Sequence, residues 1–196
     1  NSMREIELKI LELPKAIFLK KMRELGAQKV HAVHIRIRYF DYPDGRIRAK
    51  KDLMRIRELT PIGSAKRSHS RTEVVYKIYQ GIKGGCKVFD ELEFELKGKD
   101  SFEKASEFLK RIGLVSKVYY EKKRTLFAYR HWKFEFDEHP KIPSFLEIEA
   151  EDAKEVMKMV KRLGLDEYET TPETIQEVLT RKYPQLKFND LTFAQR

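Results

Sequence analysis

Charged and apolar residues alternate with a period of two in a short segment near the start of the chain. Glu5, Glu7 and Lys9 alternate there with Ile6, Leu8 and Ile10. In a β-strand, successive side chains point to opposite faces, so this pattern predicts a strand with one charged face and one apolar face.

The same alternation returns at residues 91–96 and 145–149, again with glutamates at alternate positions. A helical pattern follows each of the three segments, and the three predicted helices end at Gly26, Gly113 and Gly164. Asp100 is expected to cap the second helix, with Glu103 completing a capping box. This weak self-similarity indicates an internally duplicated fold rather than a solenoid, whose period would be regular.

Further alternating segments predict strands over residues 30–41, 52–58, 73–79, 119–129 and 132–137. Residues 60–72 interrupt the pattern and are expected to form a mobile loop, in which Lys66, Arg67 and Arg71 are available to an acidic partner. A last helix is predicted from Pro172 to about Tyr183, with Thr171 as its cap.

We expect residues 1–196 to form a single domain, because no linker divides the chain. Asn1 and Ser2, before Met3, are interpreted as an expression remnant, and residues 166–196 as a C-terminal helix and tail. No segment approaches the roughly 18 apolar residues of a membrane span, so no membrane partner is expected. The single Cys86 excludes an internal disulfide framework, and a cytoplasmic location is predicted.

The net positive charge of the chain indicates that its partners are anionic. Lys and Arg number 41 against 31 Asp and Glu, which gives a net charge of +10. Nucleic acid is the usual partner of such a chain, but a phosphate-rich small molecule uses the same electrostatics.

The charged faces of the predicted strands carry both signs in nearly equal number. The carboxylates are Glu5, Glu7, Glu91, Glu93, Glu95, Glu135, Asp137, Glu147 and Glu149, and the cations are Lys9, Arg36, Arg38, Arg55, Arg57, Lys77, Lys122, Arg124 and Lys133. If the strands close into a barrel, these side chains line its interior. Carboxylates bind Mg²⁺ or Mn²⁺ and guanidinium groups bind phosphate, so a metal-bound polyphosphate suits this set. The alternative is a sheet whose polar face is solvated and carries cross-strand ion pairs.

The sequence resembles the CYTH, or triphosphate tunnel metalloenzyme, superfamily, which includes class IV adenylyl cyclases, thiamine triphosphatases and inorganic triphosphatases. Residues 5–9 are similar to its Glu-x-Glu-x-Lys signature. Further similar positions follow in the same order over residues 3–165: Tyr39-Phe40-Asp41, Arg55-Ile56-Arg57, Lys77, residues 91–95, Lys122 with Arg124, Asp137 and residues 145–149.

The resemblance implies an α+β fold, in which an eight-stranded antiparallel β-barrel forms a triphosphate tunnel with helices packed outside. It implies that Glu5, Glu7, Glu147 and Glu149 hold Mg²⁺ or Mn²⁺, that Lys9, Asp137 and Glu93 assist catalysis, and that Lys9, Arg55, Arg57, Lys77, Lys122 and Arg124 bind the phosphates. Pro143 and the pair Arg36 and Arg38 depart from the family pattern. The two arginines are expected to add positive charge to the tunnel.

The expected function is therefore metal-dependent hydrolysis of a triphosphate, which is inorganic triphosphate, a nucleoside triphosphate or thiamine triphosphate. One alternative is a class IV adenylyl cyclase that converts ATP to cyclic AMP and pyrophosphate. Another is a non-catalytic module that binds polyphosphate or RNA through the basic loop at residues 66–71. The resemblance also makes a homodimer an open expectation, since the family includes dimers.

Overall fold

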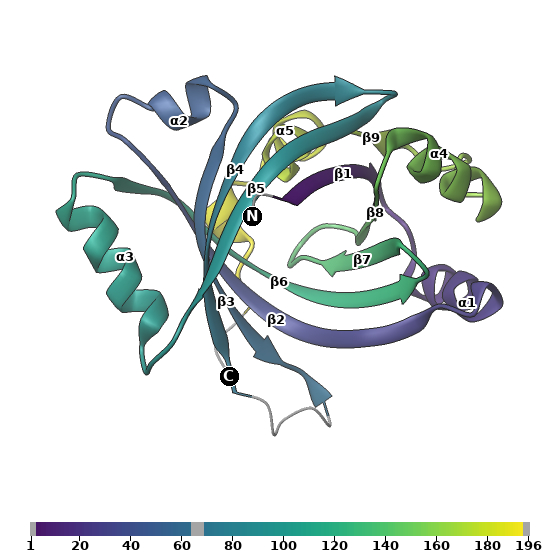
Figure 1. Cartoon of the computed structure of the whole chain (residues 1–196), viewed down its shortest axis with the longest axis horizontal. Helices are drawn as coiled ribbons and strands as arrows, with labels where there is room; N and C mark the ends of the chain where they lie inside the picture. Colours follow the sequence, from purple (N-terminus) through teal and green to yellow (C-terminus); the bar gives the residue numbers. More distant parts are fainter. Residues whose placement is uncertain (1–2, 64–68, 194–196) are drawn as a thin grey trace.

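Eight antiparallel strands close into a β-barrel, as the family resemblance implied (Figure 1). The computed structural model describes residues 3–63 and 69–193. The strands are β1 (Met3–Ile10), β2 (Gln28–Asp41), β3 (Leu53–Pro61), β4 (Arg71–Lys83), β5 (Cys86–Leu96), β6 (Val115–Tyr129), β7 (Trp132–Glu138) and β8 (Phe145–Ala150). Their order is β5-β4-β3-β2-β6-β7-β8-β1, and pairing of β1 with β5 closes the barrel. A ninth strand, β9 (Thr170–Thr171), pairs with β1.

The helices lie around this barrel. They are α1 (Lys15–Leu25), α2 (Arg46–Ala49), α3 (Ser101–Arg111), α4 (Ala153–Arg162) and α5 (Ile175–Lys182). The predictions of α1, α3 and α4 after the three glutamate-rich strands are confirmed. Within residues 3–63 and 69–193, no helix is long and apolar enough to cross a membrane.

Two predicted helix caps are wrong. Asp100 precedes α3, but its φ of 59° is left-handed and its side chain makes no capping bond. The hydroxyl of Ser101 instead donates to the carbonyl of Gly98 at 2.6 Å. The helix α5 is capped by Thr174 within a capping box, because Thr171 is already paired with β1.

The short helix α2 lies between the strands predicted over residues 30–41 and 52–58, where no helix was predicted. It is held by Asp41, whose carboxylate accepts hydrogen bonds from the backbone N–H groups of Ile47 at 3.0 Å and Arg48 at 3.2 Å. Asp41 lies six residues before Ile47, at the end of β2, so the periodicity of apolar residues does not reveal this contact.

The predicted loop at residues 60–72 is shorter than expected. β3 continues to Pro61 and β4 begins at Arg71, whose guanidinium donates to Glu73 at 2.7 Å. Lys66 and Arg67 lie outside the described residues. The strand β4 also extends past the end predicted at residue 79. Gly81 lies at a bulge within it, and only Gly84 and Gly85 separate β4 from β5.

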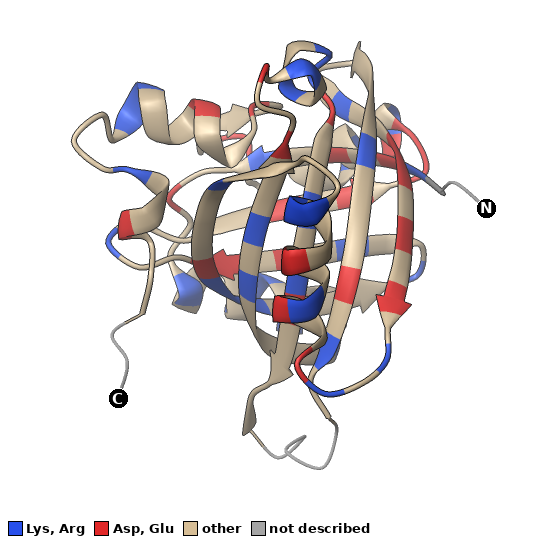
Figure 2. Ribbon diagram, turned by 90° about the vertical axis from the view of Figure 1, so that its left-hand side faces the viewer, with Lys and Arg blue, Asp and Glu red and all other residues tan. Residues whose placement is uncertain are grey.

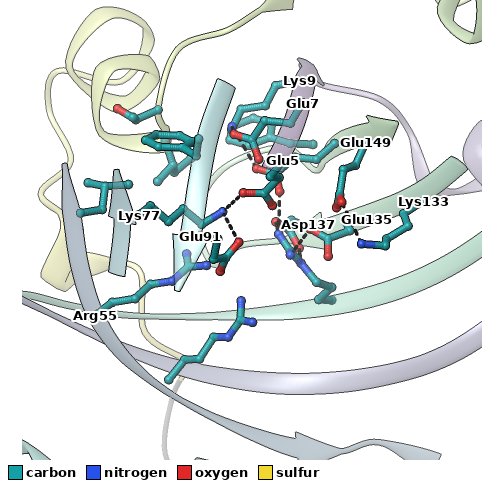
Figure 3. Close-up of a pocket in the computed structure, with 18 of the residues that line it drawn as sticks. Glu5, Glu7, Lys9, Arg55, Lys77, Glu91, Lys133, Glu135, Asp137 and Glu149 are labelled. Atoms are coloured by element: carbon teal, nitrogen blue, oxygen red, sulfur yellow. Dashed lines mark hydrogen bonds and ion pairs between the residues drawn. The ribbon is translucent and has the colours of Figure 1, made fainter. Parts of the chain in front are cut away.

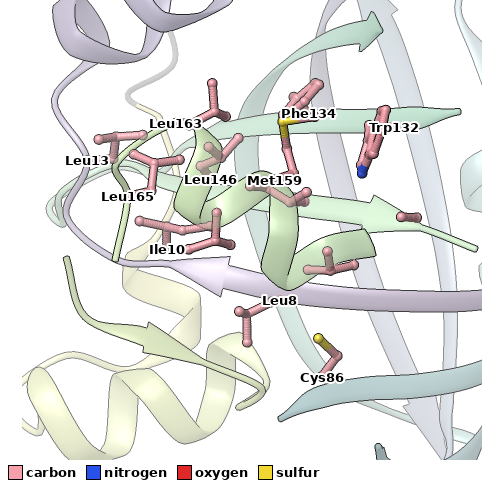
Figure 4. Packing of buried hydrophobic residues seen from close by; sticks show 14 of the residues in the cluster. Leu8, Ile10, Leu13, Cys86, Trp132, Phe134, Leu146, Met159, Leu163 and Leu165 are labelled. Carbon is pink, nitrogen blue, oxygen red and sulfur yellow. The ribbon is translucent and has the colours of Figure 1, made fainter. Parts of the chain in front are cut away.

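The main hydrophobic core lies outside the barrel wall. α1 and α4 cover the outward faces of β1, β7 and β8, where Leu8, Phe134, Leu146 and Met159 are at most 3% exposed (Figure 4). On the opposite side, Phe102 and Leu109 of α3 cover β2, β3 and β4 (Figure 1). The charged faces of most strands are thereby directed inward.

The strand β2 is an exception, because its inward face is apolar. Ile35 and Ile37 point inward and pack with Val178 and Leu179 of α5, so an apolar cluster fills the part of the interior next to the charged cavity. Arg36 and Arg38 point outward, over the ring of Phe102 at 4.7 and 4.9 Å. They pair there with Glu58 and Glu103. The expectation that these arginines add charge to the tunnel is wrong.

Candidate functional site

The interior of the barrel contains a charged cavity of about 510 Å³ (Figure 3). In Figure 2, bands of Lys, Arg, Asp and Glu recur along the strands of the barrel. Every predicted site residue lines this cavity: Glu5, Glu7, Lys9, Arg55, Arg57, Lys77, Glu93, Lys122, Arg124, Asp137, Glu147 and Glu149. The lining holds eight Lys and Arg against nine Asp and Glu. The excess positive charge of the chain therefore lies elsewhere.

β1 and β8 place four of the charged side chains next to one another. Glu7 lies opposite Glu149, and Lys9 lies opposite Glu147. The ammonium group of Lys9 is 3.0 Å from both Glu7 and Glu147, while Lys133 donates to Glu149 at 2.8 Å. Burial favours the neutral form of Lys9, but Glu147 and Glu7 together raise its pKa above the usual value. Lys9 is therefore firmly charged.

The four glutamates predicted to bind metal suit a divalent cation in their chemistry. Carboxylate oxygens are the preferred ligands of Mg²⁺, and Glu5, Glu7, Glu147 and Glu149 all point into the cavity. Within the described residues, no three acidic, His or Cys side chains already converge on one point. Each carboxylate instead contacts a lysine, so a bound cation would replace ammonium partners rather than enter a vacant cage.

Lys77 holds a second pair of carboxylates. Its ammonium group contacts Glu5 and lies 3.2 Å from Glu91. Burial raises the pKa of Glu5 to about 8, an effect that Lys77 only partly offsets. Burial also acts on Glu91, but Lys77 and Arg55 hold its pKa down at about 2. Burial therefore makes Glu5 the more readily protonated of these two carboxyls.

Asp137 joins two cations of β6 at the centre of the site. Its carboxylate accepts from Lys122 at 2.6 Å and from Arg124 at 2.6 and 2.5 Å, and it is 2% exposed. Arg124 also donates to Glu147 at 2.7 Å. Burial acts to raise the pKa of Asp137, but Arg124 and Lys122 lower it below the usual range. Asp137 therefore stays ionised and fixes the direction of both cations.

The two arginines of β3 differ in their partners. Arg57 donates to Glu73 and Glu93. Arg55 has no carboxylate within 4.0 Å among the described residues, and its Nε is a buried donor without a partner there. An enclosed guanidinium that faces a cavity without a carboxylate in direct contact indicates a binding place for an anion.

Several residues of the site were missed at the level of sequence, whereas Tyr39 was named there only as a position similar to the family. Tyr39, Tyr120 and His139 line the cavity, and burial lowers the pKa of His139 to about 4. Lys87 also points inward, since it alternates with Phe89 and Glu91 on β5, and burial together with Lys9 lowers its pKa to about 8. Extending the alternation of residues 91–96 backwards would have revealed Lys87. No sequence signal marks His139.

The chain is similar to a known protein family and to several solved structures. The family model for the CYTH domain matches residues 3–174. The PH1012 protein of Pyrococcus horikoshii is 25% identical, with a TM-score of 0.69 over 88% of this chain and 98% of its own. The PH1819 protein of the same organism is 24% identical, with a TM-score of 0.71 over 91% and 99%. HpAC1 from Hippeastrum, an adenylyl cyclase candidate described as having a dominant triphosphatase activity, is 13% identical, with a TM-score of 0.63 over 90% and 94%. No curated protein matches the chain.

Proposed function

Because the chain belongs to the CYTH family, we propose that it is a divalent-metal-dependent phosphohydrolase that cleaves a triphosphate bound inside its barrel. The observation that carries this proposal is Arg55, a guanidinium that faces the charged cavity with no carboxylate partner among the described residues. A phosphate group would supply the missing anion through charge-assisted hydrogen bonds.

The cations of the cavity are placed so that they can bind several phosphates at once. Lys9, Lys77, Lys122 and Arg124 are 5–8% exposed and come from three separate strands. With Arg55 and Arg57 they surround the cavity, so phosphate oxygens entering it meet donors on several sides. In the attack of water on phosphorus, such fixed cations offset the charge that develops on the leaving phosphate.

Two acidic residues position these cations. Asp137 orients Lys122 and Arg124, and Glu93 directs Arg57. Lys9 lies between Glu7 and Glu147, where it can pass from a carboxylate to a phosphate oxygen. We assign Lys9, Asp137 and Glu93 these supporting roles in the reaction.

The charge balance of the cavity supports a need for metal. Eight cationic side chains face nine acidic ones, so the protein alone provides no excess positive charge for a triphosphate. Glu5, Glu7, Glu147 and Glu149 would hold Mg²⁺ or Mn²⁺, which supplies Lewis-acid neutralisation of phosphate oxygens when bound. Metal and substrate are then expected to bind together.

A class IV adenylyl cyclase remains the second candidate, because HpAC1 is described with both names and shares the fold. A cyclase would use the same phosphate-binding residues, but the ribose 3′-hydroxyl would attack the α-phosphate. The aromatic residues Tyr39 and Tyr120 on the cavity wall are compatible with a nucleoside nearby.

The deciding experiment is incubation with tripolyphosphate or with ATP, in Mg²⁺, Mn²⁺ or chelator, while released phosphate and cyclic AMP are both assayed. Metal-dependent release of phosphate without cyclic AMP is the expected result. Cyclic AMP with pyrophosphate would identify a cyclase. Neither product, with polyphosphate still bound by the folded protein, would identify a non-catalytic binding module.

A further inference from the structure

A second cavity of about 660 Å³ adjoins the charged cavity. Leu53, Phe89 and Thr174 line both, so the two spaces meet at these residues. The walls of the second cavity come from the α2 region, the β4–β5 hairpin and α5. A ligand that extends beyond the first cavity in this direction therefore enters the second.

Three cations of the second cavity lack a close carboxylate partner. Within residues 3–63 and 69–193, neither Arg48 nor Lys51 has a carboxylate within 4.0 Å, and Lys87 has only Glu177 at 3.5 Å. Arg48 is reached instead by the side-chain amide of Gln176, whose oxygen can accept from both Nη atoms at 3.1 and 3.2 Å. Lys87 is 5% exposed, so its charge is held inside the protein with one distant partner.

The carboxylates of the same cavity are engaged elsewhere. Asp52 accepts hydrogen bonds from the hydroxyl of Tyr76 at 3.2 Å and the backbone N–H of Tyr79 at 2.9 Å. Glu173 pairs with Arg181 at 2.6 Å, and Glu177 accepts from Thr174 in the capping box of α5. None of them is therefore within 4.0 Å of Arg48 or Lys51, and only Glu177 reaches Lys87, at 3.5 Å.

The aromatic residues of this cavity do not offer free ring faces. The ammonium group of Lys51 lies 5.3 Å from the ring centre of Tyr79, and that of Lys87 lies 5.9 Å from the ring centre of Phe89. These positions place cations where a flat organic ring would stack. An anionic ligand fits the site better than a nucleobase.

We propose that the second cavity is a subsite for additional phosphate groups, so that the protein binds inorganic polyphosphates longer than three phosphates. This inference rests on the proposed function, because the first three phosphates occupy the charged cavity. Lys87 lines the second cavity two residues before Phe89, which lines both spaces, and Arg48 and Lys51 receive the phosphates beyond it.

The test compares the binding of linear tripolyphosphate and tetrapolyphosphate by isothermal titration calorimetry in the presence of Mg²⁺. Wild-type protein is expected to bind tetrapolyphosphate about tenfold more tightly than tripolyphosphate, because one more phosphate gains charge-assisted hydrogen bonds. The double variant Arg48→Gln, Lys51→Gln should lose this preference while it still binds tripolyphosphate. The matched control is Arg46→Gln, Lys50→Gln, which removes the same charge from the α2 region at residues that do not line the cavity.

A second variant, Lys87→Met, keeps the length of the buried side chain and removes its charge, and it should also lose the preference. Equal wild-type affinity for the two ligands, or equal loss in the control, would overturn the subsite. The subsite would also be overturned if the Arg48 and Lys51 variant lost affinity for ATP but kept its preference for the longer polyphosphate. That result would identify the second cavity as a nucleoside site. Absence of all polyphosphate binding to the wild-type protein would instead reject the proposed function itself.

Discussion

Adjacent lysines on β6 face opposite sides of the barrel wall. Lys122 points into the cavity, whereas Lys123 points outward, with its ammonium group 4.7 Å from the ring centre of Phe193. We predict that Lys122→Met weakens tripolyphosphate binding roughly tenfold or more, since hydrogen bonds to charged groups contribute about 1.5–3 kcal/mol. Lys123→Met is the matched control and should bind as the wild-type protein does. Calorimetric titration measures both, and equal affinities would remove Lys122 from the phosphate-binding set.

His139 makes a separate prediction about stability and pH. Burial lowers its pKa to about 4 from 6.5, and its Nδ1 has no partner among the described residues. Because the folded pKa is the lower one, the unfolded chain binds the proton first as pH falls, and stability present above about pH 6.5 is lost toward pH 4. Between about pH 7 and pH 5 this loss amounts to about 2 kcal/mol.

The His139→Gln variant should therefore lose less unfolding free energy than the wild-type protein over the same pH interval. Urea denaturation at the two pH values gives the comparison, and the difference between the proteins isolates His139 from the carboxylates that also titrate. Parallel pH profiles would show that His139 is not held neutral by the fold.

At the scale of elements, the β4–β5 hairpin packs closely against the start of α4. A Cβ atom added to Gly84 would lie 2.9 Å from the Cβ of Ala153, whereas one added to Gly85 would meet nothing within 4 Å. Both glycines have positive φ, so alanine costs about 1–2 kcal/mol at either position. Gly84→Ala should lower the unfolding free energy by about 1–3 kcal/mol more than Gly85→Ala, because of the overpacking. Equal losses in thermal or urea unfolding would contradict this packing.

The sequence predicted those elements whose signals are local. The alternation in residues 5–10 and 91–96 placed Glu5, Glu7 and Glu93 in the cavity, because a two-residue period assigns each side chain to a face. The same reasoning failed for β2, where both faces are suitable for burial. Arg36 and Arg38 contact Phe102 and acidic partners outside the barrel, and the isoleucines contact α5 inside it. These tertiary contacts decide which face of β2 points inward, and the pattern of the strand alone does not reveal them.

Elements that depend on particular hydrogen bonds or strand pairings rather than on periodicity were correspondingly missed. α2 forms because Asp41 accepts its N-terminal N–H groups, and α5 begins later than predicted because β9 occupies Thr171. The site shows the same division. Its lining residues on strands followed from alternation, whereas the second cavity arises only where α2 and α5 meet the β4–β5 hairpin.

For the whole molecule, the interior charges nearly balance without any ligand. Lys9, Lys77, Lys122 and Arg124 each contact at least one carboxylate, so the barrel can fold before substrate arrives. Such pairs contribute little net stability, because burial removes both charges from water. They do keep the phosphate-binding groups in place. This arrangement predicts that bound phosphate replaces the carboxylates as the partner of these cations.

Ligand binding should accordingly stabilise the folded protein, and most strongly when metal and triphosphate are present together. At a free ligand concentration of about 100 times Kd, linkage gives about 2.7 kcal/mol, or a rise in Tm of roughly 5–10 °C for a chain of this size. Tripolyphosphate with Mg²⁺ is therefore expected to raise Tm clearly more than tripolyphosphate with chelator, because the metal corrects the acidic balance of the lining.

The double variant Glu7→Gln, Glu149→Gln separates the two contributions in a thermal-shift experiment. It retains the cations and the shape of the cavity, so it should keep the shift caused by tripolyphosphate alone and lose the additional shift caused by Mg²⁺. Glu24→Gln, on the outer surface of α1, is the control and should behave as the wild-type protein does. If the double variant kept the full Mg²⁺ effect, the metal would bind elsewhere, and the roles of Glu7 and Glu149 would have to be abandoned while phosphate binding by the cations still stood.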